Sequence, residues 1–118
     1  MEEKGVRTFT EVKLFQVKPD RVAAFESLIA AVAEMQRQQP GCVSLKYMKR
    51  SYILQGRSLP PRELTRIVKC VKFYSWWEFD TKENYGAASD WFFENYLRPV
   101  SRLLIEPFSI NLGDSCDV

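Results

Sequence analysis

The sequence of 118 residues contains no histidine. Histidine is the general base of Ser-His-Asp and Cys-His catalysis, the axial ligand of many haems and a ligand in most zinc sites. Its absence excludes these classes of site. Acid and base groups would have to come from tyrosine, lysine, aspartate or glutamate. The carboxylates never cluster at a metal-binding spacing, so we predict no metal site.

Cysteine is also scarce. Cys42, Cys70 and Cys116 are an odd number without metal-ligand spacing. Cys42 and Cys70 lie in strand-like segments and are expected to behave as small buried apolar residues. Cys116 lies in a polar tail, with nothing near it in the sequence to lower its pKa. A reducing compartment fits this cysteine usage, and we expect a cytoplasmic protein.

Long apolar runs are missing too. No segment approaches the roughly 20 apolar residues that cross a bilayer, and the segment MEEKGVRTFTEV lacks the apolar stretch of a signal peptide. The net charge is only +2, with basic residues scattered along the chain. We therefore predict neither a membrane nor a nucleic-acid partner. The length predicts a single domain over residues 1–118, with its core at about 9–112.

Alternating apolar side chains predict four β-strands. These are residues 8–17, 42–54, 66–79 and 108–112. In the second strand Val43, Leu45 and Tyr47 are expected to share one face. The polar segment 55–64 holds two prolines and a glycine and is predicted to have no regular structure.

Helices are predicted between these strands. Apolar positions at intervals of three and four from Val22 to Met35 indicate an amphipathic helix, with Asp20 as its N-cap and Pro40-Gly41 at its end. A second helical region follows the third strand. There Asp80 and Glu83 predict a capping box for a short helix. Ser89 then predicts the start of a further helix, which Pro99 should kink.

The predicted order β-α-β-β-α(α)-β is the split βαβ arrangement of ferredoxin-like folds. We therefore predict an α+β protein with a four-stranded antiparallel sheet and helices on one face. The first and third strands are apolar on both sides, so the other face would expose an apolar patch. Pairing of two sheets in a homodimer would cover it, with Trp76 at the interface and Glu78 solvated or paired across it.

The segment 73–100 concentrates the aromatic residues. It holds all three tryptophans, three of the five tyrosines and four of the eight phenylalanines. Two interpretations compete. The rings form the core of the protein, or some of them line a pocket for a flat aromatic ligand.

Two stretches of sequence carry a family likeness. QQPGCVSLKYMKRS closes a helix with Pro-Gly-Cys, and VKFYSWWEFDTKENYGAASDWFFENYLRPV has a strand ending in Trp77-Glu78 and helices bearing Ser89-x-x-Phe92. On these features the chain resembles the antibiotic biosynthesis monooxygenase (ABM) domain family of the dimeric α+β-barrel superfamily. The likeness covers roughly residues 9–112.

The resemblance implies a homodimer, a dimeric α+β barrel in which each subunit keeps a pocket between its sheet and its helices. Several relatives oxidise polycyclic phenols or quinols with O₂ and no metal or organic cofactor; others degrade haem or isomerise small carbonyl compounds. The family often has a histidine in the helix after Trp-Glu, where this chain has Gly86. Haem-degrading relatives ligate iron through that histidine, so the resemblance implies a different reaction here and no cofactor.

Oxygenase chemistry without a cofactor needs a dry aromatic slot, a proton acceptor and donors for the developing anion. The residues that match these needs are aromatic or hydrogen-bonding and lie on the strands and helices around the expected pocket. For substrate binding they are Tyr47, Phe73, Trp77 and Trp91, and for catalysis Asn84, Tyr85 and Arg98.

Each assignment has a structural alternative. Phe73 and Trp77 on a central strand are equally typical of plain core. Asn84 and Tyr85 are compatible with a solvated helix surface. Arg98 is compatible with a surface ion pair or with bonding the last carbonyls of its helix.

Three functions remain open from the sequence. The first is a cofactor-independent monooxygenase acting on a small aromatic molecule, a polycyclic phenol or a quinol. The second is a non-oxidative isomerase or cyclase, and the third is a non-catalytic dimer that binds a small ligand or only has a structural role. The segment 55–65 is longer than usual for the family, and a loop of this length can fold over a pocket mouth.

Overall fold

The computed structural model describes residues 7–66 and 69–116. In this part of the chain, six strands, two α-helices and a short 3₁₀ helix follow one another. They are β1 (Phe9–Val17), η1 (Pro19–Arg21), α1 (Val22–Arg37), β2 (Cys42–Lys49), β3 (Tyr52–Ile53), β4 (Arg62–Glu63), β5 (Val71–Phe79), α2 (Lys82–Ser101) and β6 (Ser109–Asp114).

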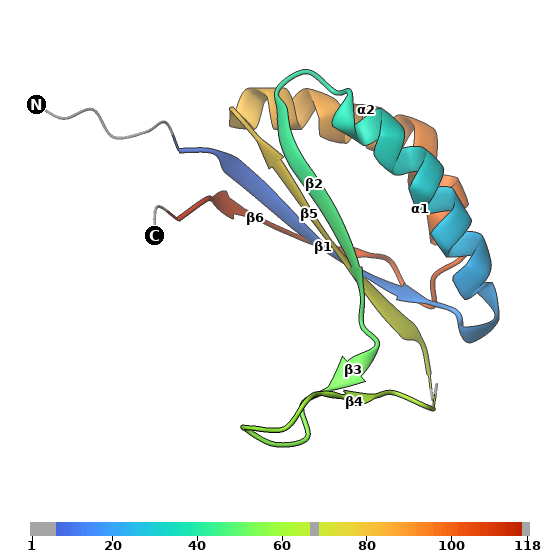
Figure 1. The fold of residues 1–118 in the computed structure, drawn as a ribbon. Helices are drawn as coiled ribbons and strands as arrows, with labels where there is room; N and C mark the ends of the chain where they lie inside the picture. The colour runs from blue at the N-terminus through green and yellow to red at the C-terminus, as the bar shows by residue number, and fades with distance from the viewer. Residues whose placement is uncertain (1–6, 67–68, 117–118) are drawn as a thin grey trace, which may run out of the picture.

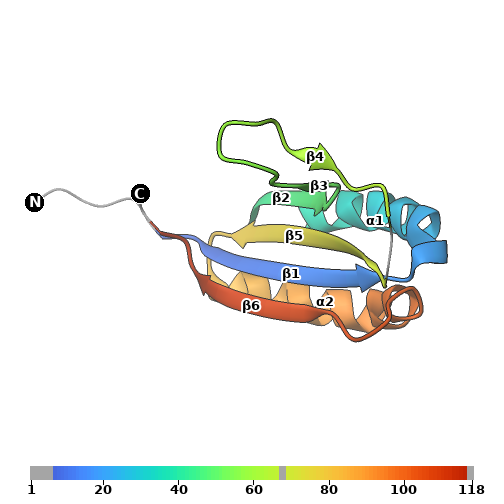
Figure 2. The same ribbon diagram turned by 90° about the horizontal axis from the view of Figure 1, so that it is seen from below.

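Four of the strands form one antiparallel sheet in the order β2-β5-β1-β6. Both helices pack on the same face of this sheet, and no element of the described residues lies on the other face (Figures 1 and 2). The predicted α+β, ferredoxin-like arrangement is confirmed. The third predicted strand begins at Val71 rather than at residue 66, and its predicted residues Ile67 and Val68 lie outside the described part of the chain.

The second predicted strand is interrupted. β2 ends at Lys49, and the separate strand β3 pairs with β4 in a small hairpin, the β3–β4 arm (residues 52–63), which projects from the end of the sheet (Figure 1). The prediction of no regular structure in residues 55–64 is therefore wrong at Arg62 and Glu63. These residues pair with Tyr52 and Ile53 on the other leg of the arm.

A register shift alters the start of β2. The pairing with β5 slips between Cys42 and Ser44, as in a β-bulge. Val43 is consequently 53% exposed, whereas Leu45 is buried. The prediction that Val43 shares a face with Leu45 and Tyr47 is wrong for this reason.

The predicted amphipathic helix is α1, whose buried side chains include Phe25 and Val32. Asp20 does not cap it. Residues Pro19–Arg21 form the 3₁₀ turn η1, and α1 follows with Arg21 at the N-cap position and no side-chain capping bond. The 3₁₀ turn places Asp20 inside a helical segment, which removes it from the capping position.

The second helical region is one helix, α2, and the two predicted helices are wrong. Thr81, not Asp80, is the N-cap, and its hydroxyl accepts a hydrogen bond from the Asn84 backbone N–H. Ser89 lies half-buried within the helix. Pro99 lies in the last turn of α2. Proline lacks a backbone N–H, but so near the end of the helix its absence affects few of the backbone hydrogen bonds of α2.

The core lies between the sheet and the two helices. Aromatic side chains dominate it, with Phe15, Phe25, Phe79 and Phe92 all at most 1% exposed. Phe25 from α1 contacts Phe73 from β5 at a ring-centroid distance of 4.7 Å. Much of the aromatic concentration in residues 73–100 is therefore core, which is the first of the two interpretations.

Candidate functional site

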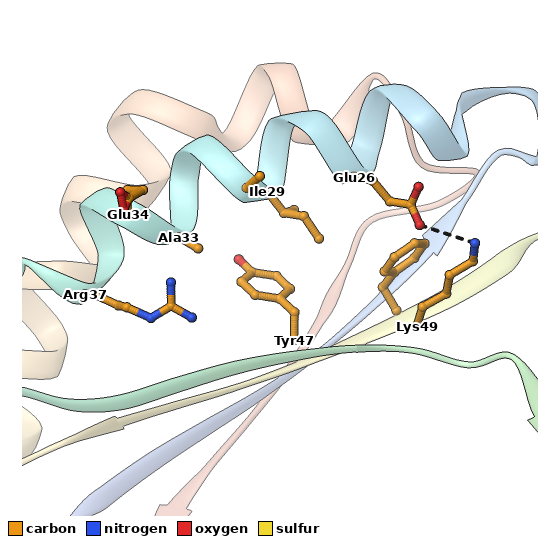
Figure 3. Close-up of a pocket in the computed structure, with 9 residues that line it drawn as sticks. Glu26, Ile29, Ala33, Glu34, Arg37, Tyr47 and Lys49 are labelled. Atoms are coloured by element: carbon orange, nitrogen blue, oxygen red, sulfur yellow. Dashed lines mark ion pairs between the residues drawn. The ribbon is translucent and has the colours of Figure 1, made fainter.

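A groove lies between α1 and the β2 edge of the sheet (Figure 3). Its volume is about 550 Å³, within the range of small-molecule sites. Helix α1 forms one wall, and β2 and β5 form the floor. The lining residues are Glu26, Ile29, Ala30, Ala33, Glu34, Arg37, Tyr47, Lys49 and Phe73.

Two aromatic rings form the floor of this groove. The ring of Tyr47 stands on β2 and points toward α1 (Figure 3). Its hydroxyl donates to Gln36 Oε1 at 2.6 Å, and burial, with the charge of Glu11, raises the Tyr47 pKa above its ordinary value. The hydroxyl therefore stays protonated, and its oxygen can accept a further hydrogen bond.

Charged side chains surround the aromatic floor. Lys49 Nζ lies 3.2 Å from Glu26 Oε2 at one end, with both side chains partly exposed. At the other end, Arg37 Nη2 donates to the Leu45 carbonyl at 3.5 Å. The groove therefore combines an apolar floor with cations at both ends, an arrangement that suits a flat molecule carrying an anionic oxygen.

A second polar feature lies inside the core. Glu11 and Lys13 are 0% and 1% exposed, and Lys13 Nζ lies 3.1 Å from Glu11 Oε1. The other carboxylate oxygen, Oε2, accepts a hydrogen bond from the Tyr85 hydroxyl. We call Glu11, Lys13 and Tyr85 the buried triad; it joins β1 to α2.

Aromatic rings enclose the ammonium group of the triad. Lys13 Nζ lies 3.7 Å from the ring centroid of Phe92, and 5.5 and 5.6 Å from those of Phe108 and Trp77. Such contacts stabilise a cation. Burial nevertheless lowers the pKa of Lys13, against the opposing effect of Glu11, and raises the pKa of Tyr85.

Two more polar groups lie beside the triad. The strand register places Ser75 opposite Lys13, and Trp77 opposite Glu11. Within the described part of the chain, Ser75 Oγ and Trp77 Nε1 are buried and have no hydrogen-bond partner. Unpaired buried polar atoms are uncommon and costly in folded proteins, so a bound water or ligand would stabilise this region.

The structure brings only some of the predicted site residues together. Tyr47 and Phe73, predicted to bind substrate, both line the groove. Trp77 and Tyr85 lie in the core, where their rings meet edge to face at 6.2 Å, and neither lines the groove. The aromatic groove and the buried triad are thus separate features of the same layer between sheet and helices.

The remaining predicted site residues lie on α2, away from the groove. Asn84 is near the start of the helix, and its amide donates to Asp80 Oδ1 at 2.9 Å. Trp91 is half-buried and packs edge to face on Tyr96 at 5.4 Å. Arg98 is exposed in the last turn. None of the three lines the groove.

The residues that supply most of the charge were not predicted from the sequence. These are Glu11 and Lys13 in the core, and Glu26 and Arg37 at the groove. A signal for the first two was present. Glu11 and Lys13 occupy alternate positions of the first strand, on the same side as the apolar Phe15 and Val17.

The segment 55–65 does not cover the groove, since none of its residues lines it. Within residues 7–66 and 69–116, no group of three or more carboxylates or cysteines lies where it would hold a metal ion. Neither α1 nor α2 is long and apolar enough to cross a membrane, as far as the described residues show.

Comparison with protein families confirms the resemblance. Residues 8–58 match the family model described as antibiotic biosynthesis monooxygenase. Comparison with curated protein sequences found no match.

Solved structures share the fold at low sequence identity. A putative antibiotic biosynthesis monooxygenase from Nitrosomonas europaea has a TM-score of 0.69 and 15% identity, over 99% of this chain and 97% of that one. The ActVA-Orf6 monooxygenase of Streptomyces coelicolor was solved with the ligand nanaomycin D. It has a TM-score of 0.67 and 16% identity, over 98% of this chain and 93% of that one. SnoaB, a cofactor-independent oxygenase from Streptomyces nogalater, has a TM-score of 0.66 and 19% identity, over 94% of this chain and 95% of that one.

Proposed function

We propose that the protein, whose residues 8–58 match the antibiotic biosynthesis monooxygenase family, is itself a monooxygenase that needs no cofactor. Its substrate would be a small aromatic phenol or quinol, its oxidant O₂ and its working form a homodimer. The observation that carries the proposal is the groove of about 550 Å³ floored by Tyr47 and Phe73. Its size and its aromatic floor suit a flat ring system.

The charged ends of the groove provide a way to activate such a substrate. Arg37 and Lys49 are positive, and a nearby cation lowers the pKa of a phenol. Glu26 beside Lys49 is the proton acceptor in this proposal. The bound molecule would lie with its ring on Phe73 and its anionic oxygen toward a cation.

The reaction balances without a further reductant. The phenolate passes one electron to O₂, and the resulting radical and superoxide combine into a peroxide on the ring carbon. Loss of water from the peroxide leaves a carbonyl group. For a methylene carbon of an anthrone, the sum is R₂CH₂ + O₂ → R₂C=O + H₂O. The side chains hold the substrate, shift its proton and limit its contact with water.

A second function is favoured by the buried triad. Glu11, Lys13 and Tyr85 provide a carboxylate, an amine and a phenol in contact with one another in the core. Such a set can accept and donate protons in an isomerase or cyclase reaction that uses no oxygen. Because all three side chains are buried, this function requires the layer between α2 and the sheet to open.

The homodimer rests on the sheet face that no helix covers. Val12, Leu14, Tyr74, Trp76 and Met48 lie on this outward face, as the strand pairing shows. Trp76 and Met48 are 36% and 42% exposed. A contiguous apolar patch on a sheet of this size is typical of a protein interface. We infer that a second copy covers it.

Oxygen uptake tests the proposed function. Purified protein would be mixed with a panel of hydroquinones and anthrones, with and without a metal chelator, while O₂ and product are followed. We expect one O₂ consumed per product, unaffected by the chelator. Arg37→Gln should lower the rate about tenfold, because it removes a cation that stabilises the anion, whereas Lys82→Gln, an exposed residue outside the groove, should not.

The other outcomes would contradict the proposal in different ways. Product formation without O₂ consumption would identify the isomerase or cyclase. Binding of an aromatic probe, with quenching of protein fluorescence but no turnover of any substrate, would identify a ligand-binding protein.

A further inference from the structure

A strongly basic hollow lies at the base of the β3–β4 arm, and none of its described lining residues belongs to α1 or α2. Its volume is about 430 Å³. Among its described lining residues, four have cationic side chains and none has a carboxylate. The lining residues are Gln16, Arg50, Leu64, Arg66, Lys69, Cys70 and Lys72.

A smaller hollow of about 210 Å³ adjoins the first and shares most of its walls. It adds Lys49 and one carboxylate, Glu63, together with the hydroxyl of Ser51. Five cations therefore surround the two hollows against a single acid. This charge ratio contrasts with the net charge of only +2 for the whole chain.

The fold gathers these cations from separate parts of the sequence. The Arg50 backbone N–H donates to the Lys72 carbonyl at 2.9 Å, which fixes the end of β2 beside the start of β5. The Leu64 N–H donates to the Ser51 carbonyl at 2.8 Å and closes the arm. Gln16 pairs with Lys72 across β1 and β5. The cations that are scattered in the sequence thus converge on one concave surface.

Within the described residues no salt bridge compensates the cations of this surface, and the one carboxylate bonded to a lining side chain is Glu106, whose Oε2 accepts from Gln16 Nε2 at 2.8 Å. Among the described residues, Arg50, Arg66, Lys69 and Lys72 form no salt bridge; the ion pairs are Lys13 with Glu11 and Lys49 with Glu26. Cations held close together repel one another, and a bound anion offsets this repulsion. A concave surface on which cations outnumber carboxylates attracts anions.

We propose that this hollow, the arm-base site, binds a small phosphorylated molecule. Arginine presents a planar fork that matches two phosphoryl oxygens, and lysine adds a mobile point charge. Leu64 and Cys70 provide an apolar wall for the organic part of the ligand. The volume admits a compact phosphate ester but gives no extended track of the kind that nucleic acids require.

This inference is independent of the oxygenase proposal. The aromatic groove is lined from α1, β2 and β5, and the arm-base site from the arm and the strand ends. The two share no lining residue; Lys49 lines the groove and the smaller adjoining hollow. A ligand at the arm base would therefore bind whether or not the groove is catalytic.

Calorimetric titration with inorganic pyrophosphate at low ionic strength tests the proposal. We expect saturable binding with one site per chain. The double variant Arg50→Gln, Lys72→Gln should weaken binding at least tenfold, because it removes two of the four cations. The matched variant Arg57→Gln, Lys82→Gln removes two exposed cations that line neither hollow, and it should change the affinity less than twofold.

Three results would overturn the proposal. The first is an equal effect of the two double variants, which indicates attraction by overall charge. The second is citrate binding as tightly as pyrophosphate, which removes the preference for phosphoryl groups. The third is dissociation of a dimer in the arm-base variant without any pyrophosphate binding to the parent protein, which assigns these cations to contacts with a second copy. Thermal unfolding of each variant checks that it is folded.

Discussion

At the scale of single residues, the buried ion pair of Glu11 and Lys13 is the most demanding feature of the molecule. Both side chains are almost fully excluded from water, and removing two charges from water costs several kcal/mol each. The Tyr85 hydroxyl and the ring of Phe92 offset part of that cost. Such a pair is strongly interdependent, because neither charge is tolerable alone.

Substitution of Lys13 tests this interdependence. Lys13→Met should lower the free energy of unfolding by about 3–5 kcal/mol, because it leaves the Glu11 charge buried without a partner. The double variant Glu11→Gln, Lys13→Met should recover most of the loss, since glutamine is neutral and still accepts from Tyr85. Urea unfolding measures both. An equal loss in the single and double variants would show that packing, rather than charge, determines the effect.

The residue scale is also where prediction from the sequence was weakest. Lys13 lies on the same side of β1 as Phe15 and Val17, but a lysine at such a position is normally solvated. Its burial depends on α2 crossing above it and bringing Tyr85, which no local pattern encodes. Tyr47 and Phe73 were predicted as pocket residues and lie in a groove. Their roles in substrate binding, like the catalytic roles predicted for Asn84, Tyr85 and Arg98, stay predictions.

At the scale of elements, the turn between α1 and β2 joins the two halves of the fold. Gly41 has a φ of +85°, in the left-handed region that glycine adopts without strain. Its backbone also lies against the start of α2. An added Cβ would fall 2.4 Å from Asp80 Oδ1 and 2.6 Å from Asn84 Nδ2. The Asp80 N–H donates to the Gly41 carbonyl at 2.9 Å.

Glycine substitutions in these elements should have opposite effects. Gly41→Ala should destabilise the protein by about 1–3 kcal/mol, through backbone strain and the clash with Asp80 and Asn84. Gly86→Ala should stabilise it by about 0.5–1 kcal/mol, because Gly86 lies in α2 with no atom near its added Cβ. Chemical denaturation of both variants measures the difference. A Gly41→Ala protein as stable as the parent would contradict the close packing of Gly41 against Asp80 and Asn84.

Regular elements with strong periodicity were predictable and irregular ones were not. The strands around Phe15 and Phe73 and the helix around Phe25 follow directly from apolar spacing. The single helix α2 does not, because Ser89 and Pro99 resemble boundaries locally. Packing of Tyr85, Ala88 and Phe92 on the core keeps that helix continuous instead.

At the scale of the whole molecule, helices cover one face of the sheet, and the part of the chain that the structure describes leaves the other face without cover (Figures 1 and 2). The outward face presents the rings of Tyr74 and Trp76, whose centroids lie 6.1 Å apart. Both strands that carry this face, β1 and β5, lie in the centre of the sheet. Their position makes the apolar surface continuous across the middle of the molecule.

Charge introduced on this face should disrupt the proposed dimer. Trp76→Glu should convert the protein to a monomer at micromolar concentration, because an unpaired carboxylate in an apolar interface is costly. Leu97→Glu changes a residue of similar exposure on α2 and should leave the assembly unchanged. Sedimentation velocity measures both. A parent protein that sediments as a single chain would refute the dimer.

The β3–β4 arm stands apart from the layered body (Figure 1). Its two legs are joined near the sheet by the bond between Leu64 and Ser51. The conformation of the arm between Ser51 and Leu64 therefore has little effect on how the strands of the sheet pair. Residues 54–61 form a place where this scaffold can gain or lose length, or accept a foreign peptide, while its layers stay intact.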